Sequence, residues 1–158
     1  MKKTETTLLI LKKEDEILLG FCKRGFSTGK YNGVGGKLEP NENPEEAMIR
    51  ECQEEVSVTP TKYEKVGFID FLEYAKGEKE NVLFHLYIAT SWEGTPTESD
   101  EMVPHWFNIK NIPYDKMFPD DKYWMPLILE GKKIKAFFEF DENWNIINNT
   151  IEEVEELN

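Results

Sequence analysis

Three glutamates are spaced so that they share one side of a helix. Glu51, Glu54 and Glu55 stand at positions i, i+3 and i+4, which places their carboxylates side by side. Such a group of like charges destabilises a helix unless cations neutralise it. Carboxylate oxygens suit Mg²⁺ or Mn²⁺, ions that also hold substrate phosphates. These residues taken alone are more typical of a solvated helix face than of a metal site.

A glycine-rich stretch precedes these glutamates. Gly33, Gly35 and Gly36 permit close backbone approach and leave amide and carbonyl groups within reach of a metal or a phosphate. Arg50 is placed to reach Glu54 and also Glu42 across the loop. As plain surface ion pairs these contacts would contribute little to stability.

The helix that must carry the glutamates is predicted at residues 44–56. Asn43 is a favourable N-cap, Pro44 suits the first helical position, and Glu46 completes a capping box. Met48, Ile49, Cys52 and Val56 share one apolar face, which lies beside the acidic face.

The remaining patterns alternate between strands and one further helix. We expect a hairpin, two longer strands, one short strand, a second helix and a closing strand pair, followed by an acidic segment that is a solvated end or a frayed helix. These elements are, in order, 7–11 with 16–21, 63–72 and 82–90, 104–108, 119–129, 132–140 with 145–149, and 152–158. The sequence therefore predicts an α/β fold in a single domain, residues 1–158.

The charge balance narrows the range of partners. The chain has 31 Asp and Glu against 19 Lys and Arg, a formal net charge of −12. A nucleic-acid polymer or an anionic membrane would be repelled, whereas a small anionic ligand can bind through cations. Cys22 and Cys52 have no disulfide or zinc spacing, and no N-terminal apolar run is long enough for a signal or a span. We expect a cytoplasmic monomer that acts on a small molecule.

Combined, these residues resemble a known signature. Gly36, Glu42 and Arg50 through Val58 match the Nudix box, G-x5-E-x7-R-E-U-x-E-E-x-G-U, except that Ser57 stands in place of glycine. Since that glycine would end the helix with a positive φ, Ser57 is expected to cost about 1–2 kcal/mol in the same conformation. The resemblance implies a Nudix α/β/α sandwich with a mixed β-sheet, and hydrolysis that depends on Mg²⁺ or Mn²⁺.

The similarity extends over about residues 7–150. Segments 23–26, 31–37, 94–102 and 118–124 resemble the MutT-like vertebrate enzymes that hydrolyse oxidised purine nucleoside triphosphates. The implied reaction converts 8-oxo-dGTP, and also 2-hydroxy-dATP, to the monophosphate and pyrophosphate, which sanitises the nucleotide pool.

The resemblance also implies the residues of the site. The metal ligands are Glu51, Glu54, Glu55, Glu101 and the Gly35 carbonyl, with Arg50 in the catalytic group. The substrate would contact Thr7, Asn32, Val34, Gly35, Gly36, Lys37, Phe71, Phe118, Asp120 and Asp121. Cys22, Val82 and Phe118 depart from the vertebrate pattern, which leaves the base preference open.

Several questions stay open at the level of sequence. Glu51, Glu55 and Glu101 are each candidate general bases. Asp120 and Asp121, if buried together, could share a proton and so match either of two oxidised purines. The alternative functions are hydrolysis of another nucleoside diphosphate derivative, such as ADP-ribose, and nucleotide binding without catalysis.

Overall fold

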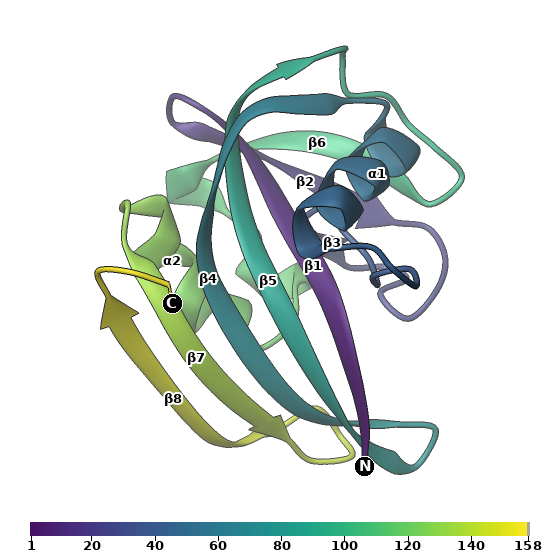
Figure 1. Ribbon diagram of the computed structural model, residues 1–158, viewed down its shortest axis with the longest axis vertical. Helices are drawn as coiled ribbons and strands as arrows, with labels where there is room; N and C mark the ends of the chain where they lie inside the picture. Colours follow the sequence, from purple (N-terminus) through teal and green to yellow (C-terminus); the bar gives the residue numbers. More distant parts are fainter. Residues whose placement is uncertain (158) are drawn as a thin grey trace.

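The computed structural model describes residues 1–157 and is built around one mixed β-sheet (Figure 1). Seven strands run in the order β3-β2-β1-β5-β4-β7-β8, and β6 pairs with β2 outside this path. The strands are β1 (Lys2–Lys13), β2 (Glu16–Cys22), β3 (Tyr31–Asn32), β4 (Thr59–Ala75), β5 (Glu78–Glu93), β6 (Met102–Asn108), β7 (Lys133–Phe140) and β8 (Ile146–Val154).

Strand β1 lies in the middle of the sheet. It pairs with β2 as an antiparallel hairpin and with β5 in parallel, while β4 is antiparallel to β5 and parallel to β7. The expected hairpin and the expected long strand pair are therefore present, although β4 and β5 extend several residues beyond the predicted ranges at both ends.

Helix α1 (Pro44–Val56) has the predicted bounds. Asn43 accepts a hydrogen bond from the Glu46 N–H, and Glu46 accepts one from the Asn43 N–H, so the capping box is complete. The helix ends at Ser57, whose φ of 62° and ψ of 32° are left-handed. Ser57 thus keeps the conformation that the signature's glycine would adopt.

Helix α2 (Asp121–Leu129) begins two residues later than the sequence indicates. The Phe118 N–H donates to the Asp121 carboxylate, and the Asp121 N–H donates to the Phe118 carbonyl, so a turn occupies residues 118–121. Two short 3₁₀ helices, η1 (Ile109–Asn111) and η2 (Tyr114–Lys116), connect β6 to this turn.

The two helices cover opposite faces of the sheet. Side chains alternate along a strand, and Leu8 and Ile10 of β1 pack in one apolar cluster with Trp124 and other α2 residues. Leu9 and Leu11 pack in a second cluster with α1 residues, including Met48 and Cys52. This arrangement is the expected α/β/α sandwich (Figure 1).

The C-terminal end differs from its prediction. Residues up to Val154 belong to β8, an edge strand that pairs with β7, so the acidic segment is not simply a solvated end. Because β8 is mostly exposed, it accommodates charged residues such as Glu152 and Glu153, which do not follow the alternation of apolar and polar residues. Glu153 forms an ion pair with Lys132 at 2.9 Å. Asn158 lies outside the described residues. Among those described, no helix is sufficiently long and apolar to cross a membrane.

Candidate active site

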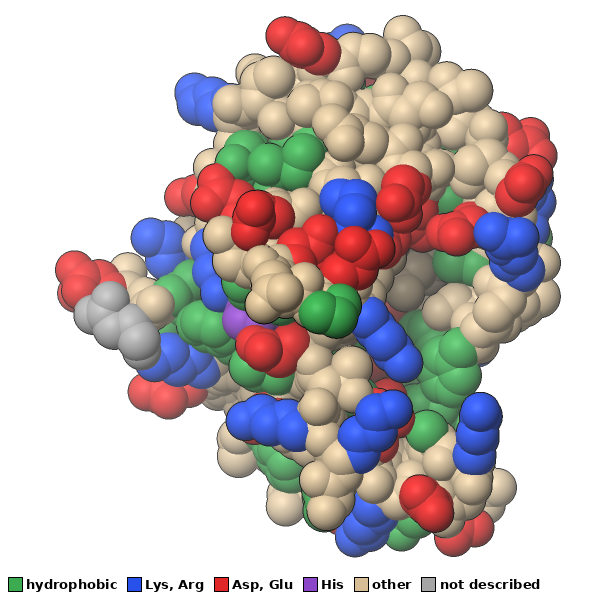
Figure 2. All heavy atoms as spheres, turned by 45° about the vertical axis from the view of Figure 1, so that its right-hand side comes forward, with side chains coloured by type: hydrophobic (Ala, Val, Ile, Leu, Met, Phe, Trp, Pro, Cys, Tyr) green, Lys and Arg blue, Asp and Glu red, His purple; other side chains and the backbone are tan. Residues whose placement is uncertain are grey.

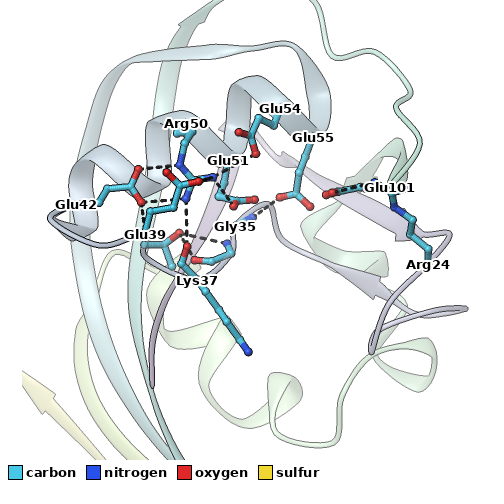
Figure 3. A network of polar contacts seen from close by, with 12 residues as sticks. Arg24, Gly35, Lys37, Glu39, Glu42, Arg50, Glu51, Glu54, Glu55 and Glu101 are labelled. Atoms are coloured by element: carbon cyan, nitrogen blue, oxygen red, sulfur yellow. Dashed lines mark hydrogen bonds and ion pairs between the residues drawn. The ribbon is translucent and has the colours of Figure 1, made fainter. Parts of the chain in front are cut away.

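Three carboxylates from two distant segments meet beside helix α1. Glu51 and Glu55 project from the helix, and Glu101 immediately precedes β6. Each of the three residues contributes one carboxylate oxygen, and these three oxygens lie within 4.8 Å of one another (Figure 3). Figure 2 shows acidic side chains gathered in a band across the middle of one face of the molecule, with basic side chains among them. Two of the three predicted helix glutamates, Glu51 and Glu55, thus lie beside the predicted Glu101 of the distant loop.

The glycine loop is pressed against these carboxylates. The Gly35 N–H donates to Glu55 Oε1 at 2.7 Å. A Cβ at Gly36 would lie 2.5 Å from Glu51 Cδ, and one at Gly35 would lie 1.9 Å from the Thr7 carbonyl oxygen. Glycine is needed at position 35 because the obstacle there is backbone, whereas a side chain at position 36 would have to displace the Glu51 carboxylate.

The cluster carries charge that its surroundings do not fully compensate. Burial, together with the nearby Glu51 and Glu101, raises the pKa of Glu55 to about 9, and only the Gly35 N–H opposes this shift. Burial also raises the pKa of Glu51, against the effect of Arg50. Such a group is stable with a proton or a bound cation in its midst.

Arg50 organises the adjoining side of the site. Its Nη1 donates to Glu51 at 2.8 Å and to Glu54 at 3.2 Å, and its Nη2 donates to the Lys37 carbonyl at 3.1 Å. Two further hydrogen bonds join the guanidinium to Glu42 and lower the pKa of that carboxyl to about 2.

Glu54 differs from its neighbours in position. Its side chain is 56% exposed, and it is not among the three carboxylates whose oxygens converge. In the described structure its contact is with Arg50, and Figure 3 shows it above the other glutamates.

A cavity of about 290 Å³ opens on the α2 side of the sheet. Its lining includes the predicted residues Asn32, Lys37, Phe71, Phe118, Asp120 and Asp121. Phe71 stacks on Phe140 with 5.9 Å between ring centroids, so part of the wall is aromatic. A flat heterocycle with a polar edge fits a cavity with these surfaces.

The two aspartates form the polar edge of the cavity. Asp120 and Asp121 are 3% and 4% exposed, Trp124 Nε1 donates to Asp120 at 2.7 Å, and the Phe118 N–H donates to Asp121 at 3.2 Å. Burial raises the pKa of both carboxyls, and the neighbouring Asp120 raises that of Asp121 further. Two buried acids in contact therefore favour a state with one shared proton.

Four residues predicted to contact the substrate lie outside the cavity lining. Val34, Gly35 and Gly36 follow the loop toward the carboxylates instead. Thr7 has its hydroxyl 3.4 Å from the Gly36 carbonyl, whereas its neighbour Thr6 lines the cavity. The reason is strand alternation, because neighbours on β1 point to opposite faces.

Sequence reasoning missed a second acidic pair in the cavity. Glu73 and Glu80 stand opposite each other on β4 and β5, and both line the cavity. Burial raises the pKa of Glu73 to about 7, with Glu80 and Asp120 adding to the shift and Lys37 opposing it. The period-two pattern from Phe71 to Glu73 was the signal that could have placed Glu73 on this face.

Comparisons with known proteins agree with this geometry. A family model described as the NUDIX domain matches residues 1–128. The chain is 42% identical to the oxidized purine nucleoside triphosphate hydrolase of Danio rerio, covering 96% of both chains. It is 40% identical to the Mus musculus protein of that name, with 94% of each covered.

More distant relatives share the fold. The 8-oxo-dGTP diphosphatase of Escherichia coli is 27% identical, over 85% of this chain and all of that protein. A MutT structure from Bacillus halodurans superposes with a TM-score of 0.83 at 22% identity, over 94% of this chain and 97% of that one. With the family model covering most of its length and two close relatives matched nearly end to end, the chain belongs to the NUDIX domain family.

Proposed function

We propose that this protein hydrolyses oxidised purine nucleoside triphosphates, 8-oxo-dGTP and also 2-hydroxy-dATP, to the monophosphate and pyrophosphate. One observation carries the proposal: the single segment 32–37 joins the two halves of the site. Asn32 and Lys37 line the cavity, while Gly35 between them contacts the carboxylate cluster. A base held in the cavity would therefore direct its phosphates past Lys37 toward the carboxylates. The two vertebrate relatives are oxidized purine nucleoside triphosphate hydrolases by name, which supports the same substrate class.

The donor set fits Mg²⁺ or Mn²⁺. Glu51, Glu55 and Glu101 supply converging oxygens, and no N–H group of residues 1–157 donates to the Gly35 carbonyl, which leaves that oxygen available. All-oxygen ligands are those these ions prefer. Glu54 stays in the proposed ligand set, but its side chain would have to rotate away from Arg50 to reach a bound cation. When bound, the cations would neutralise the phosphate chain and make its phosphorus more electrophilic.

The protein's own side chains have separable roles in this reaction. Arg50 holds Glu51 in place, and Lys37 offers its ammonium group to the phosphates as a point charge. A carboxylate of Glu51, Glu55 or Glu101 accepts the proton of the attacking water. Asp120 and Asp121 contact the edge of the base, and Phe118 packs against its face.

A substrate panel tests the proposal directly. Pyrophosphate release with Mg²⁺ is expected to be fastest for 8-oxo-dGTP and 2-hydroxy-dATP, and slower for dGTP and ADP-ribose. Preference for ADP-ribose would instead favour a Nudix pyrophosphatase of another specificity. No hydrolysis of any nucleotide, with binding retained, would favour a non-catalytic module.

Two matched variants test the proposed metal ligands. Glu55→Gln is expected to reduce turnover more than a hundredfold and to weaken Mn²⁺ uptake in calorimetry at least tenfold, because it removes one converging anionic ligand. Glu155→Gln makes the same chemical change on an exposed residue and should change neither. Unchanged Mn²⁺ uptake by Glu55→Gln would refute the assignment of this residue.

We also retain a single catalytic domain over residues 1–158, a monomeric state and a cytoplasmic location as proposals. Both free cysteines are buried and unpaired, which suits a reducing compartment. The net charge of −12 disfavours nucleic-acid polymers and anionic membranes as partners. Equilibrium sedimentation tests the monomer directly.

A further inference from the structure

Trp144 has a backbone conformation that large side chains avoid. It lies in the turn between β7 and β8, and its φ of 63° is left-handed. This region is sterically unfavourable for residues with a Cβ, and bulky residues are found there mainly where surrounding structure enforces it. The position of its indole therefore needs an explanation beyond turn formation.

The turn around Trp144 is held by a dense set of hydrogen bonds. The Asp141 carboxylate accepts from the Asn143 N–H at 2.8 Å and from the Asn145 N–H and side-chain amide, both at 2.9 Å. The Trp144 N–H donates to the Asp141 carbonyl at 3.2 Å, and the Asp141 N–H donates to the Asn145 carbonyl at 2.9 Å. The backbone at Trp144 is thus fixed before any ligand arrives.

This turn places the indole in the wall of the cavity. Its ring centroid lies 5.1 Å from that of the buried Phe140, 5.7 Å from Phe118 and 5.0 Å from Phe26. Phe140 in turn stacks on Phe71. Trp144 therefore connects the buried aromatic residues of the cavity to Phe26, which is 67% exposed at its rim.

The indole makes these ring contacts without a polar anchor. Within residues 1–157, no group accepts a hydrogen bond from the indole Nε1–H of Trp144. The backbone conformation and the aromatic packing hold the side chain in place, so that the flat indole forms a rigid part of the cavity lining. Aromatic rings held in this way bind nucleobases by stacking.

Building on the proposed function, we propose that Trp144 is a base-binding residue of this enzyme. The indole forms the side wall against which the purine ring packs, while Asp120 and Asp121 contact the edge of the base. The turn keeps the ring in place beforehand, so little side-chain entropy is lost when the nucleotide binds. A flat bicyclic base gains most from this wall, and a smaller pyrimidine gains less.

Binding of the product tests this role apart from hydrolysis. Calorimetry with 8-oxo-dGMP in EDTA is carried out on the full chain and on Trp144→Ala, Trp144→Phe and Trp106→Ala. Trp144→Ala should bind about tenfold more weakly, and Trp144→Phe should recover most of the loss because it keeps an aromatic ring. Trp106→Ala should bind normally, because Trp106 is a partly exposed ring stacked on Trp92 away from the cavity lining.

A second pair of variants separates binding from folding. Glycine relieves the left-handed strain that alanine keeps, so Trp144→Gly should unfold at a higher temperature than Trp144→Ala while binding 8-oxo-dGMP equally weakly. In steady-state assays both should raise KM with little change in kcat. If Trp144→Ala or Trp144→Gly bound 8-oxo-dGMP as tightly as the wild type, the proposed role of Trp144 would be overturned, and the proposed function would be unaffected. Failure of the wild-type protein to bind 8-oxo-dGMP would overturn the proposed base specificity as well.

Discussion

The Arg50 guanidinium donates hydrogen bonds to both carboxylate oxygens of Glu42. Nε donates to Oε2 at 2.7 Å and Nη2 donates to Oε1 at 2.9 Å, with the side chains only 22% and 12% exposed. Glu42 Oε1 also accepts from the Glu39 N–H. A parallel two-bond contact of this kind fixes geometry as well as charge. Arg50 therefore ties the loop before α1 to the helix that carries the carboxylates.

The first prediction follows from this contact. Arg50→Lys should lower the free energy of unfolding by about 1–2 kcal/mol, because an ammonium group cannot serve Glu42 and Glu51 together. It should also lower kcat/KM more than tenfold by releasing Glu51. Urea denaturation and initial rates measure the two effects. A double-mutant cycle with Glu42→Gln should show coupling, and additive effects would contradict the link.

The second prediction concerns the base. Asp120→Asn keeps an oxygen to accept from Trp124 but cannot share a proton with Asp121. The ratio of kcat/KM for 8-oxo-dGTP to that for dGTP should fall at least tenfold, with a smaller change in kcat. The exposed Asp115→Asn serves as control. An unchanged ratio in Asp120→Asn would remove Asp120 from base recognition.

The third prediction is a pH dependence of stability. The pKa of Glu73 is about 7 in the folded protein against 4.5 as its ordinary value. Between these values the unfolded chain loses its proton first, so the folded state becomes less stable as the pH rises, by about 2 kcal/mol after partial screening. The groups facing Glu73 are Glu80, Asp120 and Lys37. Glu73→Gln stays neutral and should lose less stability over this interval.

Urea denaturation at pH 5 and pH 8 checks this difference. The advantage of Glu73→Gln over the wild type should grow from the lower to the higher pH. Glu78→Gln, exposed on the same hairpin, should follow the wild type at both. If Glu73→Gln also follows the wild type at both, Glu73 is ionised in the fold.

The fourth prediction uses the end of α1. Ser57→Gly should raise the free energy of unfolding by about 0.5–1 kcal/mol, because relief of the left-handed strain exceeds the extra entropy of glycine in the unfolded chain. Ser57→Ala keeps the Cβ and should not stabilise. Hydrolysis rates should be unchanged in both. A Ser57→Gly variant no more stable than Ser57→Ala would show that the strain is negligible.

The sequence predicted most where local signals act alone. The bounds of α1 follow from Asn43, Pro44 and the capping box, which are all local. The end of β8 cannot be predicted from local signals, because Glu152 and Glu153 belong to the strand only through their pairing with Lys135 and Ile134 of β7.

The same distinction applies to the site. The spacing of Glu51 and Glu55 indicates a shared face, and their meeting with Glu101 was expected only through the family resemblance. Glu73 was missed because its role depends on which face of β4 borders the cavity. Trp144 was missed because its place in the cavity wall depends on ring contacts with Phe26 and Phe118, which are distant in the sequence.

Strand β1 has a further consequence for how such an enzyme can change. Thr6 and Leu8 border the cavity, while Thr7 and Leu9 bind the loop that reaches the carboxylates. Even-numbered positions thus face the cavity and odd-numbered ones face the loop. Substitutions can alter either face separately, but inserting or deleting one residue in β1 would exchange the two sets and disrupt both faces at once.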